Sequence, residues 1–187
     1  MQQFDYIIPF ISIIYGIAIA DLLSSIYRLV EERQHVRMHP VPFVWAAVCF
    51  TAIINGWWAF FQIMENFKVT SAGNLFVLSL LPTLTFLFSS AVLPNRIGES
   101  CDLWQFYRKN RVIFFSTFAA YLLSVPIILY GLFDHFNQLY VISQLVGCLL
   151  LFLCITIEKP WLHWIISLYF AYNIGAGLFN QTLTNLA

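Results

Sequence analysis

The residue of this sequence with the clearest chemical potential is Asp21, a carboxylate inside a long apolar stretch. The stretch runs from Ser12 to Arg28, and Asp21 is its one acidic residue. A charge in hydrocarbon is unfavourable, so such a residue faces protein or water and often marks a path for ions or protons. We therefore expect Asp21 to be shielded from lipid and to report on function.

Three further polar residues fall at one depth in the apolar segments. At about 1.5 Å per residue, Asn55, Thr83 and Asn173 lie roughly 18 to 21 Å from the cytoplasmic edge, and Asp21 about 10 Å from it. We interpret these four residues as a candidate polar path or ligand site. The alternative is that the amides only hydrogen-bond between helices. In the same way, the long side chain of Arg28 could partly neutralise Asp21.

Other kinds of chemistry have no support in the sequence. It contains no phosphate-binding glycine loop and no His-Glu-x-x-His motif. Its four cysteines form no Cys-x-x-Cys pair, so we expect them to be structural. We therefore predict no catalytic residues, no metal site and no cofactor. Nine basic and nine acidic residues give no excess of positive charge that would favour nucleic acid.

These residues must be positioned by membrane helices. The chain has 187 residues, of which 60% are hydrophobic and 10% charged, a composition unlike that of soluble domains. Its apolar runs have the length that a bilayer core requires. We predict an all-α integral membrane protein that forms a single bundle of six transmembrane helices, over residues 6–28, 41–64, 75–93, 112–133, 139–157 and 161–181.

The basic residues orient this bundle. Eight of the nine lie in the first, third and fifth connectors, and Lys68 alone lies on the other side. Cytoplasmic connectors are enriched in Lys and Arg, so both termini are predicted outside. A short interfacial helix after Ser100 is expected to lead into the fourth span. There Arg108, Lys109 and Arg111 should contact lipid headgroups.

Small residues recur every four positions in the first span. Ser12, Gly16, Ala20 and Ser24 would form one row on a helix, where a second helix can approach closely. We predict that this row is a packing seam, either within the subunit or between copies of it.

Two resemblances start from the same region. The segment from Tyr15 to Leu29, the basic connector and the Trp45–Phe61 segment together resemble a group of small uncharacterised bacterial membrane proteins with several spans. The first span and Leu80-Leu-Pro82 also resemble bacterial relatives of lysosomal potassium channels, which are six-helix subunits that oligomerise around their first helices. The Phe-Ser-Asp signature of that family is absent here.

We interpret the chain as a multi-pass protein of the bacterial inner membrane and a subunit of an oligomeric channel or transport assembly. It would be a homo-oligomer or would join a partner membrane subunit. One alternative is a non-transporting subunit or sensor that docks a cytoplasmic or membrane partner. Another is a subunit that binds a small ligand between its helices, at the level of Asn55 and Asn173.

Overall fold

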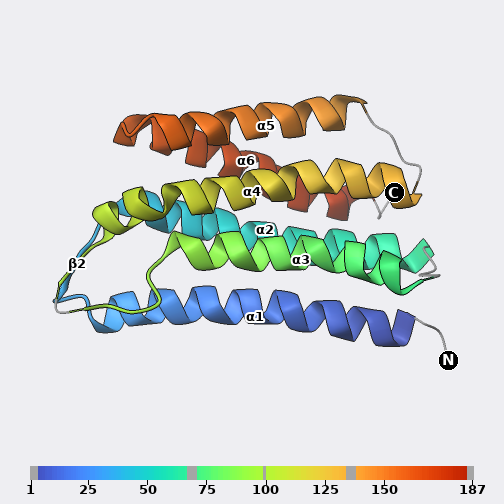
Figure 1. The fold of residues 1–187 in the computed structure, drawn as a ribbon, viewed down its shortest axis with the longest axis horizontal. Helices are drawn as coiled ribbons and strands as arrows, with labels where there is room; N and C mark the ends of the chain where they lie inside the picture. Colours follow the sequence, from blue (N-terminus) through green and yellow to red (C-terminus); the bar gives the residue numbers. More distant parts are fainter. Residues whose placement is uncertain (1–3, 67–70, 99, 134–137, 185–187) are drawn as a thin grey trace.

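The fold is a bundle of six helices in the computed structural model, which describes residues 4–66, 71–98, 100–133 and 138–184 (Figure 1). Five of the six helices are long and apolar enough to cross a membrane. The sixth is long enough but less apolar, because it carries His163, Asn173 and several aromatic residues with polar groups. The helices are α1 (Phe4–Glu31), α2 (Pro40–Asn66), α3 (Ala72–Val92), α4 (Leu103–Phe133), α5 (Gln138–Thr156) and α6 (Pro160–Thr184).

The helices pack in an order that differs from their order in the chain. Helix α1 packs on α2 and α3, α3 packs on α4, and α4 packs on α5, whereas α6 returns to pack on α2. Trp45 of α2 is fully buried, and its ring partners come from α4 and α6. Edge-on or tilted aromatic pairs, which are favourable beyond their buried area, join its ring to four phenylalanines at centroid distances of 5.1–6.3 Å: Phe114, Phe115, Phe118 and Phe170.

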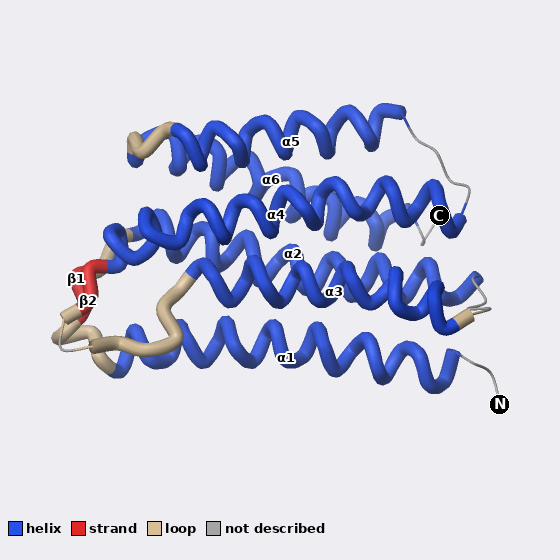
Figure 2. Tube along the Cα trace, viewed as in Figure 1, coloured by secondary structure: helices blue, strands red, loops and turns tan. Residues whose placement is uncertain are grey.

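A short parallel ladder joins two connectors at one end of the bundle (Figure 2). Strand β1 (Val36–Arg37) pairs with β2 (Cys101–Asp102), and the Cys101 amide also donates to the His35 carbonyl at 2.9 Å. The sequence did not predict this ladder. It brings the first and third connectors together at the end where eight of the nine basic residues lie. Lys68, the ninth, lies outside the described residues.

The start of α4 corrects the expected short interfacial helix. Helix α4 begins at Leu103 and continues unbroken to Phe133, and residues 93–98 and 100–102, which the structure describes before it, contain no separate helix. The Asp102 carboxylate accepts a hydrogen bond of 3.0 Å from the Gln105 amide, which satisfies one of the free donors of the first turn. The basic residues Arg108, Lys109 and Arg111 are therefore part of the same helix that enters the apolar region.

Candidate functional site

The most enclosed hollow that could hold a ligand is a cavity of about 530 Å³ between the helices. It lies in the half of the bundle farther from the β1–β2 ladder, and all six helices contribute to its walls. None of its lining residues among those the structure describes carries a charge. A cavity of this size, mostly apolar with a few polar groups, is typical of sites for small molecules.

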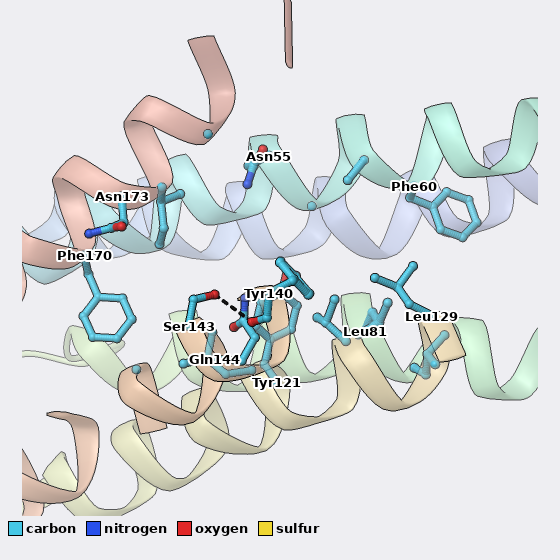
Figure 3. Close-up of a pocket in the computed structure, with 18 of the residues that line it drawn as sticks. Asn55, Phe60, Leu81, Tyr121, Leu129, Tyr140, Ser143, Gln144, Phe170 and Asn173 are labelled. Carbon is cyan, nitrogen blue, oxygen red and sulfur yellow. Dashed lines mark hydrogen bonds between the residues drawn. The ribbon is translucent and has the colours of Figure 1, made fainter. Parts of the chain in front are cut away.

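Two of the four predicted site residues line this cavity. Asn55 comes from α2 and Asn173 from α6, on one wall, and Tyr140, Ser143 and Gln144 of α5 lie on the opposite wall (Figure 3). The structure therefore brings Asn55 and Asn173 together, as their common depth predicted. Their role in function stays a prediction.

The hydrogen bonding of these polar side chains is uneven. Asn173 donates from Nδ2 to the Tyr169 carbonyl at 2.9 Å, and the Ser143 hydroxyl donates to the Tyr140 carbonyl at 2.7 Å. By contrast, Oδ1 of Asn55 is buried and has no hydrogen-bond partner among the described residues. A buried acceptor left without a donor costs about 1–3 kcal/mol. Because this oxygen has almost no accessible surface, the side-chain amide of Asn55 must rotate before a ligand in the cavity can donate to it and remove this cost.

Beside Asn55, Gly56 allows two tyrosine hydroxyls to approach the backbone of α2. A Cβ at position 56 would lie 3.1 Å from the hydroxyl oxygen of Tyr15 and 3.4 Å from that of Tyr121. Both tyrosines line the cavity, and they come from α1 and α4. The missing side chain of Gly56 thus places two groups that can donate or accept hydrogen bonds at the cavity wall.

Thr83 does not reach the cavity. It lies exposed on another face of α3, and its hydroxyl donates to the Ser79 carbonyl at 2.7 Å. From α3 the cavity is lined instead by Leu78 and Leu81. Counting residues gave the depth of Thr83, but depth does not fix how a helix is rotated about its axis.

Asp21 is also separate from the cavity and has a polar partner elsewhere. It is half-buried between α1 and α3, where its Oδ2 accepts a hydrogen bond of 2.6 Å from the Ser90 hydroxyl. The expected ion pair with Arg28 is not among the ion pairs of the described residues, and the guanidinium donates instead to the Asn95 carbonyl. The hydroxyl of Ser25 donates to Oδ1 of the same Asn95 at 2.6 Å. This set of polar contacts fastens the second half of α1 to the end of α3.

In its middle, at Gly16 and Ala20, the predicted seam of small residues makes no close contact with another helix in the part of the chain that the structure describes. A Cβ on Gly16 would meet no atom within 4 Å, and Ala20 is exposed. Ser12, at the start of the row, accepts a hydrogen bond of 2.9 Å from Trp57 Nε1, and Ser24 is half-buried. The version of the prediction that places this row between two copies of the chain stays a prediction.

The three basic residues expected at lipid headgroups line a second hollow of about 700 Å³, close to the ladder. Arg111 and Arg108 both bind Glu158, at 2.6 and 3.3 Å, which ties α4 to the connector before α6. The hydrogen bond from Arg111 is the main reason why the pKa of Glu158 is lowered. Lys109 is exposed. Contact of this cluster with headgroups stays a prediction.

One buried polar pair was not expected from the sequence. Tyr107 of α4 and His163 of α6 lie 2.8 Å apart, from hydroxyl oxygen to Nδ1, and both side chains are buried. His163 Nε2 lies 2.9 Å from the Ile157 carbonyl, which can only accept. Nε2 therefore carries the proton, and the Tyr107 hydroxyl donates to Nδ1. This chain of bonds holds α6 against α4 near the ladder end.

The tyrosines and Gln144 of the cavity were missed as site residues. Gln144 had a usable signal, because it is the one sizeable polar side chain in the apolar part of α5. Tyr15, Tyr121 and Tyr140 had none, since tyrosines are also common at membrane interfaces.

Comparisons with protein-family models, with curated proteins and with solved structures find no match for this chain. The two resemblances described above therefore stay predictions.

Proposed function

We propose that this protein is a membrane-embedded subunit that binds a small, uncharged molecule with hydroxyl or amide donors. The observation that carries this proposal is the cavity of about 530 Å³, which has an uncharged wall and the unpaired Asn55 Oδ1. An ion or a charged ligand would enter the low-dielectric interior without a counter-charge, at a high cost. A neutral donor avoids this cost and completes the hydrogen bonding of Asn55.

The remaining lining supports the same class of ligand. Leu81, Leu122 and Phe170 supply apolar surface, and Gln144, Tyr15 and Tyr121 supply groups that can orient a polar molecule. Few, well-placed polar groups in an apolar wall are the usual means of fixing a ligand's orientation.

The test uses purified full-length protein in detergent and three six-carbon probes. Thermal unfolding is followed with 1,2-hexanediol, hexanoate and hexylammonium. A ligand that binds only the folded state stabilises it by RT ln(1 + [L]/Kd), which is about 2.7 kcal/mol at 100 times Kd. We expect the diol alone to raise the unfolding temperature.

Asn55→Leu should abolish this rise, because leucine has a similar shape and no acceptor. Leu87→Ala, on an exposed face of α3, is the control and should respond like the unchanged protein. An equal rise in the Asn55→Leu variant, or a larger rise with either charged probe, would contradict the proposal.

A second proposed function is the oligomeric channel or transport assembly. The exposed Gly16 and Ala20 on α1 favour it, because a row of small residues without a partner helix in the chain suits contact with another copy. The position of Asp21 gives no support to a path through one subunit, since it is not among the residues that line the cavity. Ion flux in liposomes, with empty liposomes and an Asp21→Asn variant as controls, tests this function.

A further inference from the structure

The cavity has its mouth on one side of the bundle. Three of the lining residues are exposed, and they come from two helices only: Ser143 from α5, and Tyr169 and Asn173 from α6. The other lining residues are buried or half-buried. The exposed lining residues therefore place the opening between α5 and α6, and Figure 3 shows Ser143 and Asn173 on the two sides of the cavity.

The packing of the two helices explains this opening. Helix α5 packs mainly on α4, where Gly147 allows close approach: a Cβ there would lie 3.0 Å from Leu122 Cδ1. Helix α6 packs mainly on α2 and has only sparse contact with α5. Two consecutive helices thus have different partners and leave a gap where the cavity reaches the surface.

The mouth lies at a level where a membrane would surround the protein. Ser143 is five residues from the start of α5, or about 8 Å along a helix of 19 residues. Exposed hydrophobic side chains of the same helix, Leu145, Val146 and Leu149, lie further along it. A molecule that leaves the cavity through this mouth therefore enters acyl chains and not water.

The polar groups at the mouth offer acceptors. The hydroxyl proton of Ser143 and one proton of Asn173 Nδ2 are used within their own helices. The Ser143 oxygen and the Asn173 carbonyl oxygen keep lone pairs that can accept hydrogen bonds. Deeper in the cavity the Asn55 carbonyl oxygen is a further acceptor without a partner. These groups match a molecule that carries several hydroxyl donors.

We infer that the ligand is a neutral, single-chain amphiphile with a polyhydroxyl head, of the monoacylglycerol class, which enters from the bilayer between α5 and α6. This inference rests on the proposed function, to which it adds the ligand class and the route. The head lies in the cavity, with one hydroxyl near Asn55 and another at the level of Ser143 and Asn173. The alkyl chain continues from there between α5 and α6 into lipid. By the orientation predicted from the basic residues, the route opens to the outer leaflet.

The experiment uses full-length protein in phosphatidylcholine nanodiscs and a monoacylglycerol that carries a photoactivatable diazirine near its head. Labelled residues are located by mass spectrometry. We expect saturable labelling within residues 138–147 and 169–177, reduced about tenfold by an excess of unlabelled monoacylglycerol. A fatty acid and a phosphatidylcholine with the same diazirine should label exposed faces of the bundle without saturation.

Ser143→Trp tests the route, because the larger side chain fills the mouth. We expect it to slow saturable labelling at least fivefold. Ser116→Trp is the matched control, since Ser116 is also exposed and also donates to a carbonyl of its own helix. The control should label like the unchanged protein.

These experiments test the entry route and the proposed function separately. Unchanged labelling kinetics in Ser143→Trp, or saturable labelling at Leu123 and Ile127 on the α4–α5 side, would overturn entry between α5 and α6. The response to 1,2-hexanediol that depends on Asn55 would then still support the proposed function. If that response is absent too, the function itself is wrong. Saturable labelling by the fatty acid instead of the monoacylglycerol would overturn the ligand class.

Discussion

The Ser90 hydroxyl donates a hydrogen bond of 2.6 Å to Oδ2 of Asp21, and this bond joins α3 to α1. It gives a half-buried carboxylate a partner inside an apolar helix. We therefore expect the hydrogen bond between Ser90 and Asp21 to stabilise the fold, and its contribution can be measured.

We predict that Asp21 and Ser90 are coupled in stability. Ser90→Ala should lower the free energy of unfolding by about 1 kcal/mol, because hydrogen bonds between membrane helices average about 0.6 and those to charged groups are stronger. Asp21→Leu should cost a similar amount, and the double variant little more than either one. Unfolding in mixed micelles measures this, with Ser79→Ala as the control, since Ser79 bonds only its own helix at Phe76. Strictly additive losses would show that the pair is not coupled.

Asn55→Leu should stabilise the protein in the absence of ligand. The change removes a buried acceptor without a partner, which costs about 1–3 kcal/mol, and keeps the size of the side chain. We expect a gain of about 1 kcal/mol in the free energy of unfolding. Asn173→Leu is the comparison, because Asn173 is exposed and already bonded to Tyr169, so its effect should be smaller. A clear loss of stability in Asn55→Leu would indicate that Asn55 has a structural partner.

Two glycines that lie in different surroundings provide a matched pair. Gly147→Leu should destabilise the fold by about 1–3 kcal/mol. A Cβ at this position would already lie 3.0 Å from Leu122 Cδ1 and 3.5 Å from Phe170 Cζ, so a larger side chain forces these residues apart. Gly16→Leu should leave the stability of the single chain unchanged, since nothing lies within 4 Å of its Cβ. If the row on α1 joins two copies, Gly16→Leu should lower the measured mass of the particle. The same mass in both proteins would show that the row faces lipid.

The ion pairs of Glu158 should make stability depend on pH. The hydrogen bond from Arg111 lowers the pKa of Glu158 in the folded state. The stabilisation is therefore present at pH values above the ordinary carboxyl pKa and is lost as the pH falls through the lowered one. We expect Glu158→Gln to be less stable than the unchanged protein at pH 7 and to approach it on acidification. The difference in unfolding midpoint between the two, followed from pH 7 to pH 3, measures this, and a difference that grows in acid would contradict it.

The six helices could be predicted because each has an apolar run of sufficient length, and the prolines within them did not end them. Asn55 and Asn173 were assigned to one level by counting residues, and they line one cavity. Thr83 was assigned to the same level but lies on another face of α3, because rotation about the helix axis is set by packing between helices. Packing of this kind leaves no periodic signal in a uniformly apolar sequence.

The start of α4 and the β1–β2 ladder are further features that could not be predicted from the sequence. Asp102 both caps α4 and belongs to β2, where Arg37 lies 3.7 Å from its carboxylate. A strand of two residues has no alternating pattern that sequence could show, and its partner lies far away in the chain. The polar connectors were therefore read as independent loops, although the structure joins them.

This ladder also bears on how the protein is made. Val36 is synthesised about 65 residues before its partner Cys101. At about 5–20 residues per second, the first connector waits roughly 3–13 s for its strand partner. Until then the connector between α1 and α2 has no strand partner. Pairing with β2 is possible only after α3 has been synthesised. The ladder therefore forms late, and it joins the connector between α1 and α2 to the connector between α3 and α4.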